Sequence, residues 1–140
     1  MYDNILIPTD GSKGARRGIE SGLDLAKQYD ATVHTLYVID ERIHGVRTGL
    51  SSEELLLEKL EQEGEKATGE VVERAEELGL DARWKVVRGL PYEEIVDYAG
   101  ENDVDLVVMG IHGWSNRQRP HIGSVTERVI RTSETPVLPV

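Results

Sequence analysis

The sequence contains no cysteine, so disulfide bonds and thiolate chemistry are excluded. No apolar run approaches the roughly 20 residues that a membrane-spanning helix needs, so no membrane association is expected. The chain starts Met-Tyr-Asp-Asn and then enters a predicted strand, which indicates that no signal peptide precedes the fold. These absences predict a cytoplasmic protein.

Lysine is scarce, and the 26 acidic residues give a formal net charge of −10. This acidic balance argues against nucleic-acid binding as a general function, because a phosphate backbone requires an extended basic surface. The acidic composition fits a high-salt cytoplasm and an ordinary acidic protein equally well. The 140 residues, of which 39% are hydrophobic, predict one globular domain spanning residues 1–140.

Short apolar runs alternate along the chain with segments of helical periodicity. Strands are predicted at residues 2–8, 32–39, 82–88, 104–109 and 136–140. Helices are predicted at residues 13–29, from Ser51 or Ser52 to Leu78, at residues 92–101, and after Gly123. This alternation predicts an α/β domain with an open, parallel five-stranded sheet, helices on both faces and right-handed crossovers.

Each predicted helix has an apolar face. Ser12 is a candidate N-cap for the first helix, and Gly79 is a natural stop for the second. Gly64 and Gly69 each weaken that second helix by about 1 kcal/mol relative to Ala. The residues expected to face the core are Ile19, Leu23 and Ala26; Leu56, Leu60, Ala67, Val71, Ala75 and Leu78; Ile95, Val96 and Ala99; and Val125, Val129 and Ile130.

The stretch 103–131 combines a strand that ends in Gly110, a loop containing Gly113, and a helix that begins at Gly123-Ser124. Glycine lets a backbone turn sharply and approach a ligand closely. The first N–H groups of a helix have no partner inside it, and the helix dipole favours negative charge there. Ser124 and Thr126 add hydroxyl donors. The stretch is therefore a candidate phosphate cradle.

Charge is distributed unevenly over this stretch. Residues 111–131 hold four arginines against one acid, a local charge of +3 with His112 and His121 counted as neutral. A basic island in an acidic chain fits an anion-binding role. The alternative is that these arginines lie on the solvated surface and offset nearby acids.

Four motifs together resemble the universal stress protein family over essentially the whole chain. They are Gly110-x2-Gly113-x9-Gly123-Ser124, residues 5–12 (ILIPTDGS), residues 38–41 (VIDE) and residues 136–138 (PVL). The resemblance implies a Rossmann-like fold, similar to the adenine nucleotide alpha hydrolases, with strand order 3-2-1-4-5. That order makes the first and fourth strands neighbours, so Asp10 and Gly110 are expected to converge on one crevice.

The resemblance implies that this crevice binds ATP with Mg²⁺ (or Mn²⁺). Asp10 is a candidate acceptor for a ribose hydroxyl or a candidate metal ligand, and its alternative role is that of an ordinary turn residue. The backbone of Val38 would meet the adenine edge. The implied nucleotide-binding residues are Pro8, Thr9, Asp10, Val38, Gly110, Ile111, His112, Gly113, Trp114, Ser115, Asn116, Gly123, Ser124, Val125 and Thr126.

Two features depart from the family pattern. Arg117-Gln118-Arg119-Pro120-His121 stands where apolar residues are frequent, and it would either clamp the triphosphate or leave the loop mobile. Pro139 stands in the last strand, through whose edge family members commonly dimerise. Proline has no N–H to donate, so Pro139 removes one inter-strand bond from the homodimer that the resemblance implies.

The function expected is that of an ATP-binding, nucleotide-dependent stress sensor or regulator, at most a weak ATPase, with no catalytic residue assigned. A nucleotidyl-transfer enzyme is one alternative, but no Ser-Gly-Gly-x-Asp-Ser loop follows the first strand. His121-Ile122-Gly123 superficially matches a transferase signature, but it follows the fourth strand. A protein-interaction module on the same fold is the other alternative, and it predicts lost glycines where Gly113 and Gly123 are present.

Overall fold

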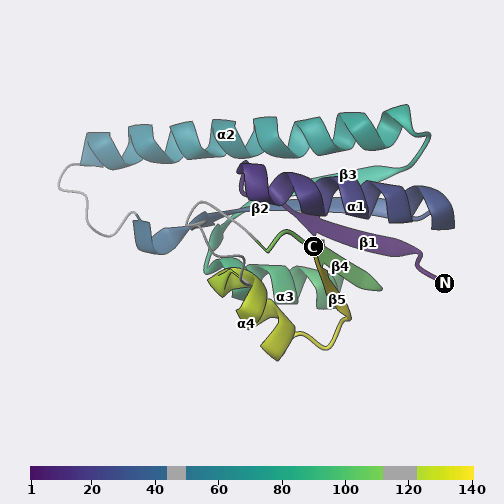
Figure 1. The fold of residues 1–140 in the computed structure, drawn as a ribbon. Helices are drawn as coiled ribbons and strands as arrows, with labels where there is room; N and C mark the ends of the chain where they lie inside the picture. Colours follow the sequence, from purple (N-terminus) through teal and green to yellow (C-terminus); the bar gives the residue numbers. More distant parts are fainter. Residues whose placement is uncertain (44–49, 112–122) are drawn as a thin grey trace.

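The computed structural model describes residues 1–43, 50–111 and 123–140. Five parallel strands form one sheet in the order β3-β2-β1-β4-β5, as predicted (Figure 1). The elements, in chain order, are β1 (Asn4–Pro8), α1 (Lys13–Tyr29), β2 (Thr32–Asp40), a 3-10 turn (Glu41–Ile43), α2 (Leu50–Glu77), β3 (Ala82–Gly89), α3 (Pro91–Glu101), β4 (Leu106–Met109), α4 (Ser124–Thr132) and β5 (Val137–Pro139). No described helix has both the length and the apolar character required to cross a membrane.

The sheet is covered on both faces, with α1 and α2 on one side and α3 and α4 on the other (Figure 1). Side chains alternate along β1, so Ile5 and Ile7 join the first core and Leu6 joins the second. All three are fully buried, which explains why a strand in the middle of a parallel sheet is a continuous apolar run.

Two of the predicted core positions are wrong. Leu78 is 36% exposed because α2 ends at Glu77 and Gly79, at φ +78°, redirects the chain so that Leu80 is buried instead. Ile130 is 40% exposed, because α4 turns Thr126 and Val129 inward. The hydroxyl of Thr126 donates to the carbonyl of Gly110 at 3.0 Å, which fixes that rotation.

At the amino edge of the sheet, buried polar groups satisfy one another. The ring of buried His34 contacts the hydroxyl of Tyr98 through Nδ1 (2.7 Å) and Oδ1 of Asn4 through Nε2 (2.9 Å). A carbonyl oxygen only accepts, so Nε2 carries the proton and Nδ1 accepts from Tyr98. Burial, and secondarily the charge of Arg83, lower the pKa of His34 and thereby favour the neutral ring. Nearby, the carboxylate of Asp105 accepts from the N–H groups of Asp3 and Asn4 (2.7 and 2.8 Å).

Candidate functional site

A cavity of about 500 Å³ opens at the carboxyl edge of the sheet, where β1 and β4 lie side by side. In an open parallel sheet this is where the crossover direction reverses and where ligands bind. Figure 1 shows that α1 and α4 both begin on this side. The cavity is lined by Pro8, Thr9, Asp10, Ala15, Leu36, Tyr37, Val38, Ile39, Asp40, Leu60, Glu63, Pro91, Ile95, Met109, Gly110, Ile111, Gly123, Ser124, Val125 and Thr126.

Ten of the predicted site residues border this one cavity. They come from the end of β1, from β2, and from the segments that follow β4 and start α4, and they are Pro8, Thr9, Asp10, Val38, Gly110, Ile111, Gly123, Ser124, Val125 and Thr126. The other five, His112, Gly113, Trp114, Ser115 and Asn116, lie outside the described residues, as do Arg117, Arg119 and His121. The sheet topology therefore brings together every predicted site residue that the structure describes.

The turn after β1 is held by its own side chains. Thr9 Oγ1 accepts from the N–H of Gly11 (3.2 Å), and Asp10 Oδ1 accepts from the N–H of Ser12 (2.8 Å). Ser12 Oγ caps α1 by accepting from the N–H of Ala15 (3.2 Å), as predicted. Gly11 has φ +79°, a conformation that favours glycine. Asp10 therefore serves the turn, and its exposed side chain also borders the cavity.

Gly110, at the end of β4, is required by close packing against α1. A Cβ at this position would collide with the backbone carbonyl of Gly14 in α1. A Cβ at Gly18, one turn further on, would lie 2.8 Å from the N of Gly110. Three glycines thus let the first turns of α1 lie directly against the end of β4, which forms the base of the cavity.

The amino end of α4 faces the cavity without a capping side chain. Its N-cap is Gly123, whose N–H donates to the carbonyl of Ile111 (2.8 Å). The first N–H groups of a helix have no acceptor within it, and residues 124–126 that carry them border the cavity. The single proton of the Thr126 hydroxyl is used on Gly110, which leaves Ser124, on the exposed side, as the hydroxyl donor of this pair.

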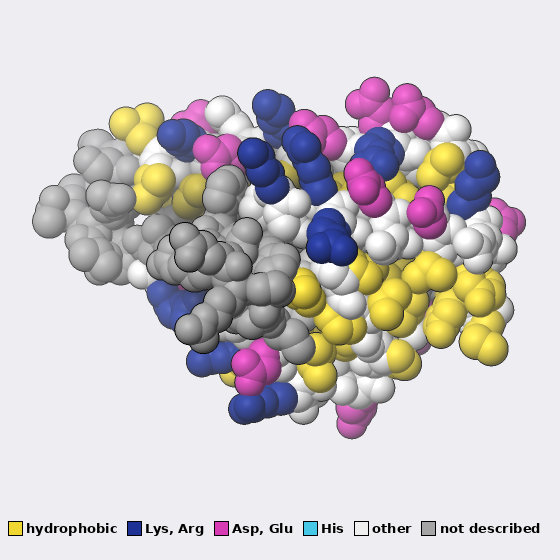
Figure 2. All heavy atoms as spheres, viewed as in Figure 1, with side chains coloured by type: hydrophobic (Ala, Val, Ile, Leu, Met, Phe, Trp, Pro, Cys, Tyr) yellow, Lys and Arg dark blue, Asp and Glu magenta, His cyan; other side chains and the backbone are white. Residues whose placement is uncertain are grey.

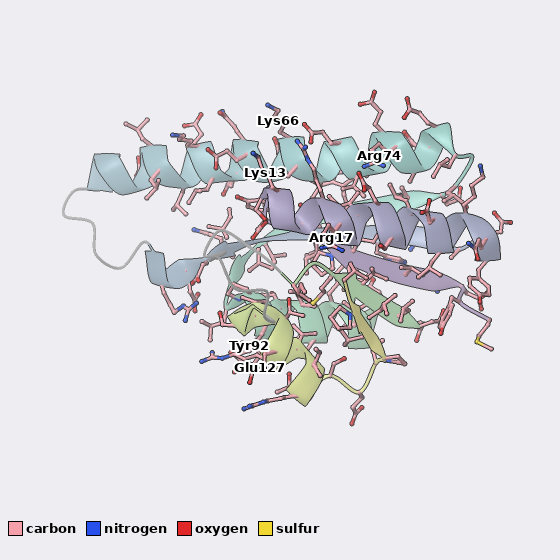
Figure 3. The ribbon with its side chains drawn as sticks, viewed as in Figure 1. Lys13, Arg17, Lys66, Arg74, Tyr92 and Glu127 are labelled. Carbon is pink, nitrogen blue, oxygen red and sulfur yellow. The ribbon has the colours of Figure 1, made fainter. Side chains whose placement is uncertain are left out.

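The basic island divides into two parts. Arg131 pairs with Glu127 (2.6 Å), and the guanidinium of Arg128 lies over the ring of Tyr92 at 5.3 Å from its centroid. Figure 3 shows Tyr92 and Glu127 together on the α3–α4 side of the molecule. These two arginines follow the surface interpretation, so an anion-binding role is left to Arg117 and Arg119, outside the described residues.

Sequence reasoning missed one wall of the cavity. Tyr37 and Asp40 belong to the end of β2 and follow the same carboxyl-edge rule as Asp10, so that rule offered a signal for them. Leu60 and Glu63 come from the middle of α2, and no local motif marks them. Burial, then the charges of Glu63 and Asp10, raise the pKa of the Tyr37 phenol. Asp40 forms an ion pair with Arg42 at 2.6 Å.

The donor set fits a nucleotide better than a free metal ion. Apolar side chains of Leu36, Val38 and Ile95 offer a surface for a flat base, and the start of α4 offers N–H groups for an anion. Within the described residues, no three His, Asp or Glu side chains are grouped to hold a metal. Mg²⁺ is commonly held by one or two carboxylates together with phosphates, so Asp10 would suffice with a polyphosphate present.

Comparison with known proteins identifies the family. Residues 1–140 match the profile of the Universal stress protein family. The chain is 38% identical to universal stress protein MJ0531 of Methanocaldococcus jannaschii, covering all of this chain and 82% of that protein. The solved structure of MJ0577 from the same organism superposes with a TM-score of 0.89 at 36% identity, covering 100% of this chain and 96% of the other.

Other solved structures of this fold contain nucleotides. A universal stress protein in complex with cAMP has a TM-score of 0.70 at 25% identity and covers 99% of this chain and 96% of its own. The universal stress protein from Archaeoglobus fulgidus, solved with dAMP, shares the fold at a TM-score of 0.73 and 22% identity, with coverages of 99% and 97%. Family profile, identity and fold agree over the full sequence, and the chain belongs to the universal stress protein family.

Proposed function

We propose that the carboxyl-edge cavity binds ATP, with Mg²⁺ or Mn²⁺ bridging its phosphates near Asp10, and that the protein is a nucleotide-dependent regulator of the stress response. Hydrolysis, where it occurs, is slow. Covalent catalysis requires a nucleophile with an adjacent base. Among the described residues that line the cavity, no such pair is present. A cytoplasmic location is part of the same proposal.

One observation carries the proposal: the uncapped amino end of α4 and the turn after β1 border the same cavity. The helix end attracts phosphates, and the apolar surface of Leu36, Val38 and Ile95 accommodates the base. Solved relatives with adenine nucleotides bound support this choice of base. Residues 112–122, which lie outside the described residues and contain the predicted site residues Gly113, Ser115 and Asn116, would complete the phosphate site.

Release of bound nucleotide is the first test. The purified protein is denatured, and the supernatant is analysed by chromatography for adenine nucleotides. The emptied protein is then refolded and titrated with ATP, with Mg²⁺ and with EDTA. Micromolar affinity that depends on Mg²⁺ is the expected result. A folded protein that does not bind ATP at low or high salt would favour a protein-interaction module on the same fold.

Gly123→Val tests the position of the phosphates. Gly123 has φ −66°, which any residue adopts, so the domain should still fold. A Cβ there lies 3.2 Å from the carbonyl of Ile111, and the branched side chain would cover the start of α4. ATP affinity should fall by more than about a hundredfold, while Gly69→Ala, in open space on α2, should leave it unchanged. Wild-type affinity in folded Gly123→Val would reject this assignment.

The same proposal includes a homodimer through β5, the edge strand of the sheet. Backbone groups of residues 136 and 140 bond to β4, which turns the backbone of residues 137 and 139 outward. Leu138 is 38% exposed, and Figure 2 shows hydrophobic side chains gathered where Figure 1 places β5 and the N-terminal end of β1. Pro139 offers a carbonyl but no N–H, so side-chain packing must supply most of the contact.

Leu138→Glu tests the dimer by light scattering. The charge should convert a dimer into a monomer, because a buried unpaired carboxylate is strongly unfavourable. Ile130→Glu, on α4 and also about 40% exposed, is the control and should leave the mass unchanged. A wild-type protein that is monomeric at all concentrations would reject the dimer.

A further inference from the structure

The side chain of Tyr37 is held in one place by a close approach of α2. The residue is 8% exposed, and a Cβ on Gly64 would lie 2.7 Å from Cδ1 of its ring. Val86 on β3 bounds the same space, at 3.0 Å from that position. Gly64 lowers the helix propensity of α2, but its lack of a side chain leaves the space that the ring of Tyr37 occupies.

The hydroxyl of Tyr37 has no hydrogen-bond partner among the described residues. The other buried tyrosine, Tyr98, uses its hydroxyl on His34. Buried polar groups in native proteins are nearly always paired, because an unpaired one is costly. Since Tyr37 borders the nucleotide cavity, a ligand in that cavity is the natural partner for its hydroxyl.

The neighbours of the phenol indicate which part of a ligand it meets. Glu63 and Asp10 border the same cavity, and their negative charges act on the phenol. Without a bridging cation a carboxylate repels phosphates, so the side of the cavity formed by Glu63 is unsuited to them, and they belong beside the start of α4 and the Mg²⁺ proposed near Asp10. The base is accommodated by the apolar residues of the α3 side. A polar wall rich in acceptors therefore fits the uncharged, hydrogen-bond-donating part of a nucleotide, which is the sugar.

We propose that Tyr37 and Glu63 recognise the ribose hydroxyl groups of the bound nucleotide and make the site selective for ribonucleotides over deoxyribonucleotides. The inference rests on the proposed nucleotide binding. It adds Tyr37 of β2 and Glu63 of α2 to Asp10, the candidate ribose acceptor in the turn after β1. A relative with this fold was solved with dAMP, so the fold itself does not impose such selectivity. It arises here from the side chains that β2 and α2 present.

Binding of ATP, 2′-deoxy-ATP and 3′-deoxy-ATP is measured by calorimetry in the presence of Mg²⁺. A hydrogen bond of ordinary strength corresponds to about a three- to tenfold difference in affinity. The wild-type protein should bind ATP more tightly than at least one deoxy analogue by about this factor. Tyr37→Phe and Glu63→Gln should each weaken the binding of ATP and leave the binding of the disfavoured deoxy analogue nearly unchanged. The ratio of the two affinities should therefore move toward one.

Two matched controls separate this role from a structural one. Tyr98→Phe removes a buried phenol hydroxyl outside the cavity. Glu65→Gln removes an α2 carboxylate that does not line the cavity and instead borders a separate surface groove beside β3. Both should keep the wild-type ratio of ATP to deoxy-ATP affinity.

The outcomes distinguish the two proposals. Wild-type protein that binds all three nucleotides equally overturns the selectivity but leaves nucleotide binding intact. Equal weakening of ATP and both analogues in Tyr37→Phe likewise overturns it, because the tyrosine would then act only on the shape of the cavity. A wild-type protein that binds none of the three overturns nucleotide binding itself.

Discussion

The two edges of the sheet use buried polar groups in opposite ways. At the amino edge, His34, Asn4 and Tyr98 satisfy one another, and Asp105 holds the backbone where β1 begins. At the carboxyl edge, Tyr37 borders a cavity, and its hydroxyl has no partner among the described residues. A buried tyrosine thus completes a hydrogen-bond network at one edge, and at the other edge it borders a cavity.

This difference shows how one sheet separates stability from function. Parallel strands place all their carboxyl ends on one side, where the loops and helix N-termini are free to face a ligand. The amino ends face short turns, where no ligand would pair with a buried polar group. Polar residues at that edge are therefore most stable when they bond to one another. The following variants test this contrast between the two edges.

The largest effect is expected from Gly110→Ala at the base of the cavity. The new Cβ would overlap the carbonyl of Gly14, and backbone atoms cannot move aside as a side chain can. The free energy of unfolding should fall by about 3 kcal/mol or more, measured by urea denaturation. Gly100→Ala, which meets nothing within 4 Å, is the control. A stable Gly110→Ala protein would show that α1 and β4 are packed less closely than described.

The two buried tyrosines compare the edges directly. Tyr98→Phe leaves Nδ1 of His34 without a donor and should lower the free energy of unfolding by about 1–2 kcal/mol. Tyr37→Phe, in the ligand-free protein, removes a hydroxyl with no described partner, so no hydrogen bond is lost and the free energy of unfolding should be unchanged or slightly higher. Urea denaturation of both variants without nucleotide measures the contrast, and equal losses would contradict it.

The amino-edge network should also make stability depend on pH. The pKa of His34 is lowered in the folded state, so between its ordinary value and that lower value only the unfolded chain binds the proton. The stability contributed is complete above about pH 6.5 and is lost as the pH falls below it, by at most about 1.4 kcal/mol per pH unit. Denaturation curves across this range should show a slope in the wild type that is smaller in His34→Gln. Identical slopes would mean that other groups dominate.

The fold could be predicted from the sequence because its signals are local. Ile5, Leu6 and Ile7 mark a strand buried on both faces, and Ser12 marks a helix start that its hydrogen bond confirms. The errors at Leu78 and Ile130 arose where periodicity alone cannot fix the rotation of a helix end. In α4 the deciding contact is from Thr126 to Gly110, which joins residues sixteen positions apart.

The site was predictable only where residues follow strand ends. Asp10, Gly110 and Ser124 could be placed together because the strand order makes their strands neighbours. Leu60 and Glu63 reach the cavity because α2 crosses above β2, and no spacing within α2 reveals that position. The meaning of Gly64 was likewise hidden, since a glycine in a helix looks only destabilising until the ring of Tyr37 is seen beneath it.

The two glycines of α2 provide the smallest and last test. Gly69 meets nothing within 4 Å, so Gly69→Ala should raise the free energy of unfolding by about 0.5–1 kcal/mol through helix propensity alone. Gly64→Ala should have the opposite sign, because its Cβ would press on the ring of Tyr37. Urea denaturation measures both. A gain at position 64 equal to that at 69 would mean that the ring moves freely, and a mobile ring could not hold its hydroxyl at the cavity wall.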